Sequence, residues 1–140
     1  MNGNGKTVCM ISCMHDLFDD RIYWKECLSL KKSGYTVFHI GFGKKDRAYV
    51  SKEGVNIIEV FRERYFVNPY LDKLFRIVTI KKNPYRKIFI AAKDTKADIY
   101  HTHDLQIGRL NKNIKSLSHK PKLIYDVHEY YPDVVLSYFR

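Results

Sequence analysis

Two histidines and an aspartate lie close together in the segment ADIYHTHDL, residues 97–105. His101 and His103 are two residues apart, so in a strand both side chains would point to one face and could hold a metal ion. Imidazole also donates or accepts a proton near neutral pH, which suits acid–base work. Asp104 is either the N-cap of a following helix or a ligand contact, and His101 can equally be a strand residue packed under a cleft. The spacing leaves three alternatives: a metal site, acid–base chemistry, or the ordinary end of a strand.

Polar side chains of similar types follow two other short apolar runs in the sequence. They are His15, Asp16, Asp19, Asp20 and Arg21 after residues 6–13, and Asp126, His128 and Glu129 around the end of residues 122–128. Each group has an ordinary explanation, since Arg21 can pair with nearby aspartates and His128 and Glu129 can belong to a plain loop. If the three apolar runs are neighbouring strands, however, these side chains converge on one cleft. Agreement among three separate segments indicates a binding site more strongly than any one of them.

The sequence alternates short apolar runs with stretches of helical periodicity, which is typical of an α/β fold. The predicted strands are residues 6–13, 35–42, 55–61, 97–103 and 122–128. Because strand–helix–strand connections between parallel strands are right-handed, we predict a Rossmann-like doubly wound parallel sheet with the strand order 3-2-1-4-5. Ligands in such sheets bind beyond the carboxyl ends of the strands, near the point where the order reverses. That point lies between the first and fourth predicted strands, where His103 ends the fourth.

The helices are predicted from apolar spacing and from signals at their ends. The first runs from a cap at Asp19 or Asp20 to a left-handed stop at Gly34. A second covers residues 71–78, and a third has Asn83 as N-cap and Pro84 at its first position. The last begins at Asp104 and carries an apolar stripe made of Ile107, Leu110, Ile114 and Leu117. In the doubly wound arrangement, such helices cover both faces of the sheet.

Length and composition indicate one cytosolic domain, residues 1–140, with a basic surface. The chain has 45% hydrophobic residues, enough for one core, and no apolar run is long enough to span a membrane. No signal peptide is recognisable, and Cys9, Cys13 and Cys27 lack the spacing of zinc or redox motifs, so we predict buried thiols. The net charge is +10, and residues 61–96 carry ten Lys or Arg against three acidic residues. This basic segment predicts affinity for an anionic membrane surface.

Three segments together resemble the N-terminal domain of retaining glycosyltransferases of family 4, which have the two-domain GT-B architecture. The segment HDLFDDRIYWKECLSLKKSGYTVFHIG, residues 15–41, is similar to the family's opening, with a His, an Asp-x-Arg-Ile, a Glu-containing helix and a Gly-Tyr-x-Val. Residues 97–105 resemble its Ala-Asp-hydrophobic-hydrophobic-His-x-His-Asp segment. The segment KLIYDVHEYYPD, residues 122–133, resembles its Tyr-Asp-x-His-Glu segment. The three stand in the family's order and span nearly the whole chain.

The resemblance implies transfer of a sugar from a nucleotide-sugar donor to an acceptor, either a polysaccharide or a lipid-linked sugar, with retention at the anomeric carbon. It implies no metal and no other cofactor. His103 would be the catalytic residue and would hydrogen-bond the reacting sugar or the acceptor. The substrate-binding residues would be His15, Asp19, Arg21, Asp104, His128 and Glu129. The family binds its donor in a C-terminal domain with a Glu-x7-Glu pair, which this chain lacks, so we expect the chain alone to be inactive.

The sequence also shows one departure from the family and leaves one competing function open. Many members have glycines after the first strand that approach the donor phosphates, whereas CMHDLFDDR has none, and Arg21 either compensates or serves the structure. The competing function is a stand-alone α/β binding module whose basic face binds an anionic membrane or nucleic acid. No nucleic-acid motif appears, so we expect no nucleic-acid partner. A lipid-linked acceptor would place the protein in the cytoplasm, peripherally at the inner face of the membrane.

Overall fold

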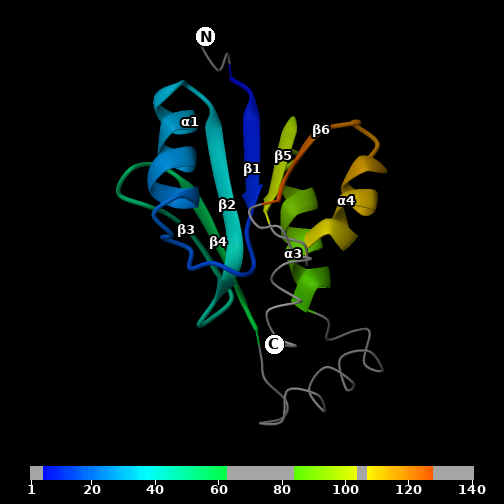
Figure 1. Cartoon of the computed structure of the whole chain (residues 1–140), viewed down its shortest axis with the longest axis horizontal. Coiled ribbons are helices and arrows are strands. Elements are labelled where there is room, and N and C mark those ends of the chain that lie inside the picture. The colour runs from blue at the N-terminus through cyan, green and yellow to red at the C-terminus, as the bar shows by residue number, and fades with distance from the viewer. Residues whose placement is uncertain (1–4, 63–83, 104–106, 128–140) are drawn as a thin grey trace, which may run out of the picture.

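A six-stranded, mostly parallel sheet forms the centre of the protein in a computed structural model, which describes residues 5–62, 84–103 and 107–127. The strand order is β3-β4-β2-β1-β5-β6, and only β3 runs antiparallel to its neighbour β4 (Figure 1). The strands are β1 Thr7–Ile11, β2 Thr36–Gly43, β3 Arg47–Val50, β4 Asn56–Phe61, β5 Ile99–His103 and β6 Lys122–Asp126. β1, at the centre, pairs with β2 on one side and β5 on the other.

The five predicted strands and their order are confirmed, and the fold is an α/β sheet compatible with a Rossmann-like arrangement. The prediction succeeded because the central strands are buried on both faces and therefore read as continuous apolar runs. The short strand β3 was missed. Its sequence, RAYV, is mostly exposed and lies at the edge of the sheet, so it lacks the apolar signal of the other strands.

Helices cover both faces of the sheet, with η1 and α1 on one face and α3 and α4 on the other (Figure 1). Their bounds are η1 Ile22–Cys27, α1 Leu28–Lys32, α3 Pro84–Asp94 and α4 Gly108–Lys115. None of these helices, within the ranges that the structure describes, is long and apolar enough to cross a membrane.

The helices differ in detail from their predicted form. The predicted first helix lies where it was expected, and Gly34 after it has the expected left-handed backbone with a φ of 84°. The first half of this helix, η1, is a π-helix and not an α-helix. α4 begins at Gly108 with Ile107 as its N-cap residue, later than the predicted start at Asp104. The predicted helix over residues 71–78 and the Asn83 cap lie outside the described residues, as does most of the basic segment 61–96.

Alternation along β1 divides the core into two layers, because successive strand residues point to opposite faces. Val8 and Met10 pack with the η1 side of the sheet, whereas Cys9 and Ile11 pack with the α3 and α4 side. All three cysteines are buried, as predicted. Burial raises the pKa of the Cys9 and Cys27 thiols to about 12. These thiols therefore stay protonated near neutral pH and act as small apolar groups.

Glu59 is a carboxylate buried under the β3–β4 edge of the sheet. It accepts a hydrogen bond from Arg47 Nε and another, 2.6 Å long, from the backbone N–H of Lys44. Burial acts to raise the pKa of Glu59, and these hydrogen bonds outweigh it, so the pKa lies below its usual range. Gly43 lies against this carboxylate, since a Cβ built on Gly43 would be 1.9 Å from Glu59 Cγ. The glycine at position 43 therefore makes room for the ion pair that ties β3 to the sheet.

The buried histidine of β2 predicts a loss of stability in acid. His39 is fully buried, with its ring centroid 6.3 Å from that of Tyr23, and burial lowers its pKa to about 4. The folded chain therefore keeps His39 neutral, whereas the unfolded chain binds a proton at the ordinary pKa near 6.5. The stabilisation is complete above pH 6.5 and is lost as the pH falls toward 4, at a cost of about 2 kcal/mol between pH 7 and pH 5.

Urea unfolding of the wild type and of His39→Leu, each at both pH values, measures this contribution. The difference in free energy of unfolding between the two pH values should be smaller in the variant by about 2 kcal/mol. Carboxylates affect both proteins alike, so they cancel in the comparison. Equal pH dependence of the two proteins would contradict the assignment.

Candidate functional site

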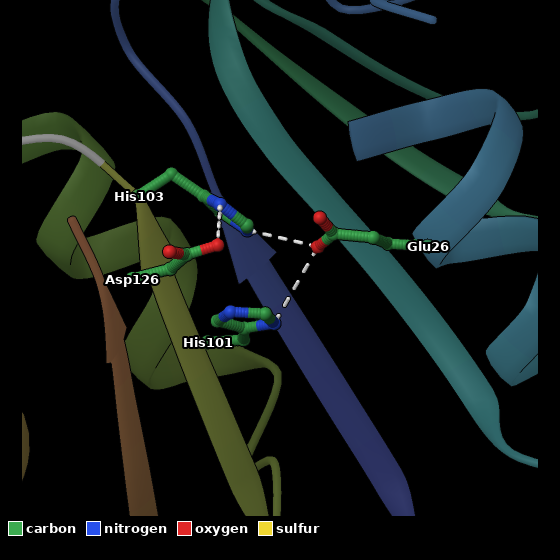
Figure 2. A group of neighbouring side chains, drawn as sticks. All are labelled: Glu26, His101, His103 and Asp126. Carbon is green, nitrogen blue, oxygen red and sulfur yellow. Dashed lines mark ion pairs between the residues drawn. The ribbon is translucent and has the colours of Figure 1, made fainter. Parts of the chain in front are cut away.

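Four side chains converge on the η1 side of the sheet, where β5 and β6 end (Figure 2). They are Glu26 from η1, His101 and His103 from β5, and Asp126 from β6, and we call them the histidine–carboxylate cluster. Glu26 Oε2 lies 3.8 Å from His101 Nδ1 and 3.7 Å from His103 Nε2. Asp126 Oδ2 lies 3.8 Å from His103 Nδ1. One donor atom from each of the four residues lies within 4.8 Å of all the others.

The geometry of β5 explains why the two histidines meet. They are two residues apart in a regular strand and therefore share a face, as the sequence predicts. Their ring centroids are 4.2 Å apart with 35° between the planes. In the parallel pairing of β5 with β6, His103 is the register partner of Asp126. Pairing in the sheet thus places a carboxylate next to the buried ring of His103.

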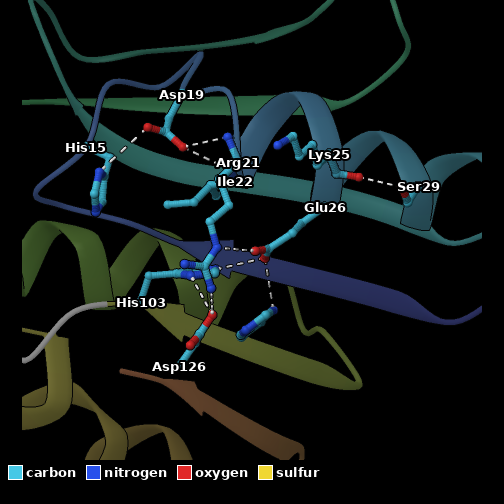
Figure 3. Close-up of polar contacts among 10 residues, drawn as sticks. His15, Asp19, Arg21, Ile22, Lys25, Glu26, Ser29, His103 and Asp126 are labelled. Atoms are coloured by element: carbon cyan, nitrogen blue, oxygen red, sulfur yellow. Dashed lines mark hydrogen bonds and ion pairs between the residues drawn. The ribbon is translucent and has the colours of Figure 1, made fainter. Parts of the chain in front are cut away.

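The π-helical turn explains why Glu26 and Arg21 lie together. The backbone N–H of Glu26 donates to the carbonyl of Arg21, 3.0 Å away, which is the i→i+5 bond of a π-helix. Residues five apart therefore share a face here, and Arg21 Nε lies 3.4 Å from Glu26 Oε1. Arg21 Nη2 also lies 3.0 Å from Asp126 Oδ2, so its guanidinium joins η1 to β6 (Figure 3).

Three hydrogen bonds made by two side chains, Asp19 and Tyr23, hold this turn in place. Asp19 Oδ1 accepts hydrogen bonds from the backbone N–H groups of Arg21 and Ile22, at 2.9 and 3.0 Å, and so caps the start of the turn. Tyr23, buried in the core, donates to Glu53 at 2.6 Å. Burial, helped by that bond, raises the pKa of the Tyr23 hydroxyl to about 12. The position of Glu26 is therefore set by a capped turn and by an anchored aromatic ring.

The predicted site residues fall into three groups. The structure brings His103 and Arg21 into one polar cluster with Asp126 between them. His15 and Asp19 pair with each other at 3.6 Å, at the start of the turn and not within the cluster (Figure 3). Asp104, His128 and Glu129 lie outside the described residues. Asp126 was expected at this edge of the sheet but without a role, and in the structure it lies beside His103.

The expectation that His103 faces an open cleft is wrong. Its side chain is fully buried, whereas Glu26 and Asp126 on either side of it are about a quarter exposed. The reason is that β6 and η1 bring carboxylates to both of its ring nitrogens, so the ring lies inside a polar layer. His101, expected under the cleft, is the more exposed of the two histidines.

Glu26 is the site residue that the sequence analysis missed. In the predicted α-helix, residues five apart point about 140° away from each other, so Glu26 would face away from Arg21. A π-turn cannot be recognised from apolar spacing alone, because Tyr23, Cys27 and Leu30 fit an α-helix equally well. One signal could have found it: Glu26 is an acidic residue on a helix that packs over the carboxyl ends of the strands.

A hollow in the described part of the chain lies at the opposite edge of the sheet. It has a volume of about 870 Å³ and lies at the amino ends of β1, β5 and β6. Its lining is basic on balance, since the five lysines outnumber the two aspartates: Lys6, Lys93, Lys96, Lys120 and Lys122 against Asp94 and Asp98, with His119 beside them. This hollow is separate from the histidine–carboxylate cluster, and its charge suits an anionic ligand and not a metal ion.

Comparison with known proteins gives no support from relatives. No family model matches the chain, and no curated protein matches it.

Proposed function

We propose that this chain is the acceptor-side domain of a retaining glycosyltransferase of GT-B architecture, similar to family 4. One observation carries the proposal: side chains from the three segments that resemble the family meet at the carboxyl edge of one parallel sheet. Arg21 follows β1, His103 ends β5 and Asp126 ends β6. Asp126 Oδ2 lies 3.0 Å from Arg21 Nη2 and 3.8 Å from His103 Nδ1. Ligands of doubly wound sheets bind at this edge, where the strand order reverses.

In this proposal each side chain has a distinct task. Asp126 orients the ring of His103 through Nδ1, and the opposite nitrogen, Nε2, serves the hydroxyl that reacts with the sugar. Arg21 is half exposed and carries a fixed positive charge, which suits a donor phosphate or an acidic acceptor. Because His103 is buried, acceptor binding must open a path to its ring. The donor nucleotide is bound by a second domain, since one such sheet cannot enclose two substrates.

The test is a comparison of this chain with the same chain joined to a donor-binding domain, which comes from the gene of this chain where the gene encodes one. Incubation with a panel of nucleotide sugars should leave them intact with the chain alone. The joined protein should consume one of them and form a product with the donor's anomeric configuration. Reproducible turnover by the chain alone would contradict the two-domain proposal.

The second candidate function is a stand-alone module that binds an anionic surface. The lysine-lined hollow at the amino edge of the sheet favours it, because several basic side chains gather there around an open volume. The two candidates differ in the downstream coding sequence that they require. A second Rossmann-like domain with a Glu-x7-Glu pair supports the transferase, and a gene without such a domain supports the binding module.

A further inference from the structure

We propose that the histidine–carboxylate cluster is a zinc site, with His101, His103 and Glu26 as ligands and Asp126 as the group that orients His103. The family resemblance implies no metal, so the proposal departs from it and rests on the cluster alone. An ion bound to His103 Nε2 would stand between that nitrogen and the acceptor hydroxyl of the proposed function. Two imidazoles and one carboxylate form a ligand set that zinc commonly takes in enzymes, where a fourth position remains for water or substrate.

The distances from Glu26 to the two histidines fit a shared metal ion better than direct hydrogen bonds. Glu26 Oε2 lies 3.7 and 3.8 Å from the facing nitrogens of the two histidines, beyond the range of a hydrogen bond. In a tetrahedral site with metal–ligand distances of about 2.0–2.1 Å, ligand atoms lie about 3.4 Å apart. The two Glu26–histidine separations exceed this value by only about 0.3–0.4 Å, and the ligand atoms of the cluster lie within 4.8 Å of one another, so side-chain movements would bring the three atoms to a common ion. The ligands come from η1 and β5, so two packed elements hold them.

The groups around the three ligands also match a metal site. His103 faces Glu26 with Nε2 and Asp126 with Nδ1, so one nitrogen can ligate while the other donates to a carboxylate. Metal-bound histidines usually have such a carboxylate or carbonyl on the second nitrogen, which sets the tautomer. Arg21 holds Glu26 through Oε1, which leaves Oε2 directed at the two rings. The two carboxylates outweigh the one guanidinium, so the site keeps a negative charge that favours a divalent cation.

The burial pattern indicates a site enclosed by the protein, because the ligand atoms Glu26 Oε2 and His103 Nε2 are both buried. The ring of His103 is fully buried, whereas the side chains of His101 and Glu26 are 17% and 24% exposed. Three protein ligands leave a fourth coordination position, which a water molecule can fill. An ion in this position could polarise a hydroxyl or a water molecule that reaches the carboxyl edge of the sheet.

Zinc titration of the metal-free chain tests the proposal without any sugar substrate. We expect one zinc ion per chain by calorimetry in the presence of a competing chelator, and X-ray absorption at the zinc edge should show two imidazole ligands. His101→Ala and Glu26→Gln should each weaken binding about 100-fold or more, and Asp126→Asn about 10–100-fold. Glu26→Gln keeps the shape of the side chain and removes only its charge, so it answers the question even if an alanine variant fails to fold.

The control is His15→Ala, which removes an exposed histidine outside the cluster and should leave zinc binding unchanged. Binding that is weaker than micromolar, or that survives both His101→Ala and Glu26→Gln, overturns the proposal, because zinc would then bind elsewhere or only adventitiously. A negative result here leaves the transferase proposal intact, and absence of sugar transfer leaves the zinc site intact.

Discussion

On the proposed transferase role, replacing His103 by alanine in the chain joined to a donor-binding domain should lower turnover about 100-fold, because the proposal places this hydrogen-bonding group at the reacting centre. The same substitution should also lower the free energy of unfolding by about 2 kcal/mol, since the ring is fully buried and its removal leaves a cavity beside two carboxylates. Turnover is therefore measured per folded molecule, well below the melting temperature of the variant. A loss of rate that exceeds the loss of folded protein identifies His103 as catalytic.

The matched control for this experiment is His39→Leu. His39 is equally buried and lies on the same face of the sheet, on the other side of β1, since Met10 is the register partner of both His39 and His101. It is not part of the histidine–carboxylate cluster. We expect His39→Leu to change stability and leave turnover nearly as it was. Equal turnover in His103→Ala and His39→Leu would contradict the catalytic role of His103. Zinc titration decides separately whether the His103 ring acts directly on the substrate or through a bound ion.

Replacing Gly43 by alanine should destabilise the fold by about 3 kcal/mol, a large part of the stability of a small domain. The added Cβ would lie 1.9 Å from Glu59 Cγ and 2.1 Å from its Oε1, so the carboxylate must leave its place. The hydrogen bonds from Arg47 and from the Lys44 N–H are then lost, and a buried charge remains without them. Urea unfolding at neutral pH measures the cost.

Gly108→Ala provides the comparison for Gly43→Ala, since it adds the same methyl group elsewhere. Among the residues that the structure describes, a Cβ at Gly108 would approach only the hydroxyl end of Tyr125, at 3.3 Å. Gly108 is also the first residue of α4, where alanine is the better helix former. We expect its free energy of unfolding to change by less than about 1 kcal/mol. A similar cost at both positions would show that the Glu59 ion pair does not determine the effect at Gly43.

The sequence predicts the sheet better than the site, and particular residues show why. The strand order and the shared face of His101 and His103 follow from apolar runs and from strand periodicity, which are local properties. The burial of His103 depends on β6 and η1, which are distant in sequence. Glu26 enters the cluster only because the turn is π-helical, and β3 forms only because β4 offers it an edge. Each of these depends on tertiary contacts that single-sequence patterns do not contain.

The π-helical turn has a consequence for recognising related sites from sequence. A π-turn contains about one residue more than an α-turn, so removing the exposed Lys25 would leave Arg21 and Glu26 four apart, the spacing that an ordinary α-helix places on one face. Two patterns of different length, Arg-x4-Glu and Arg-x3-Glu, can thus build the same pair of side chains. Searches for this arrangement should accept both spacings, and an alignment that permits only one would misplace the glutamate by a residue.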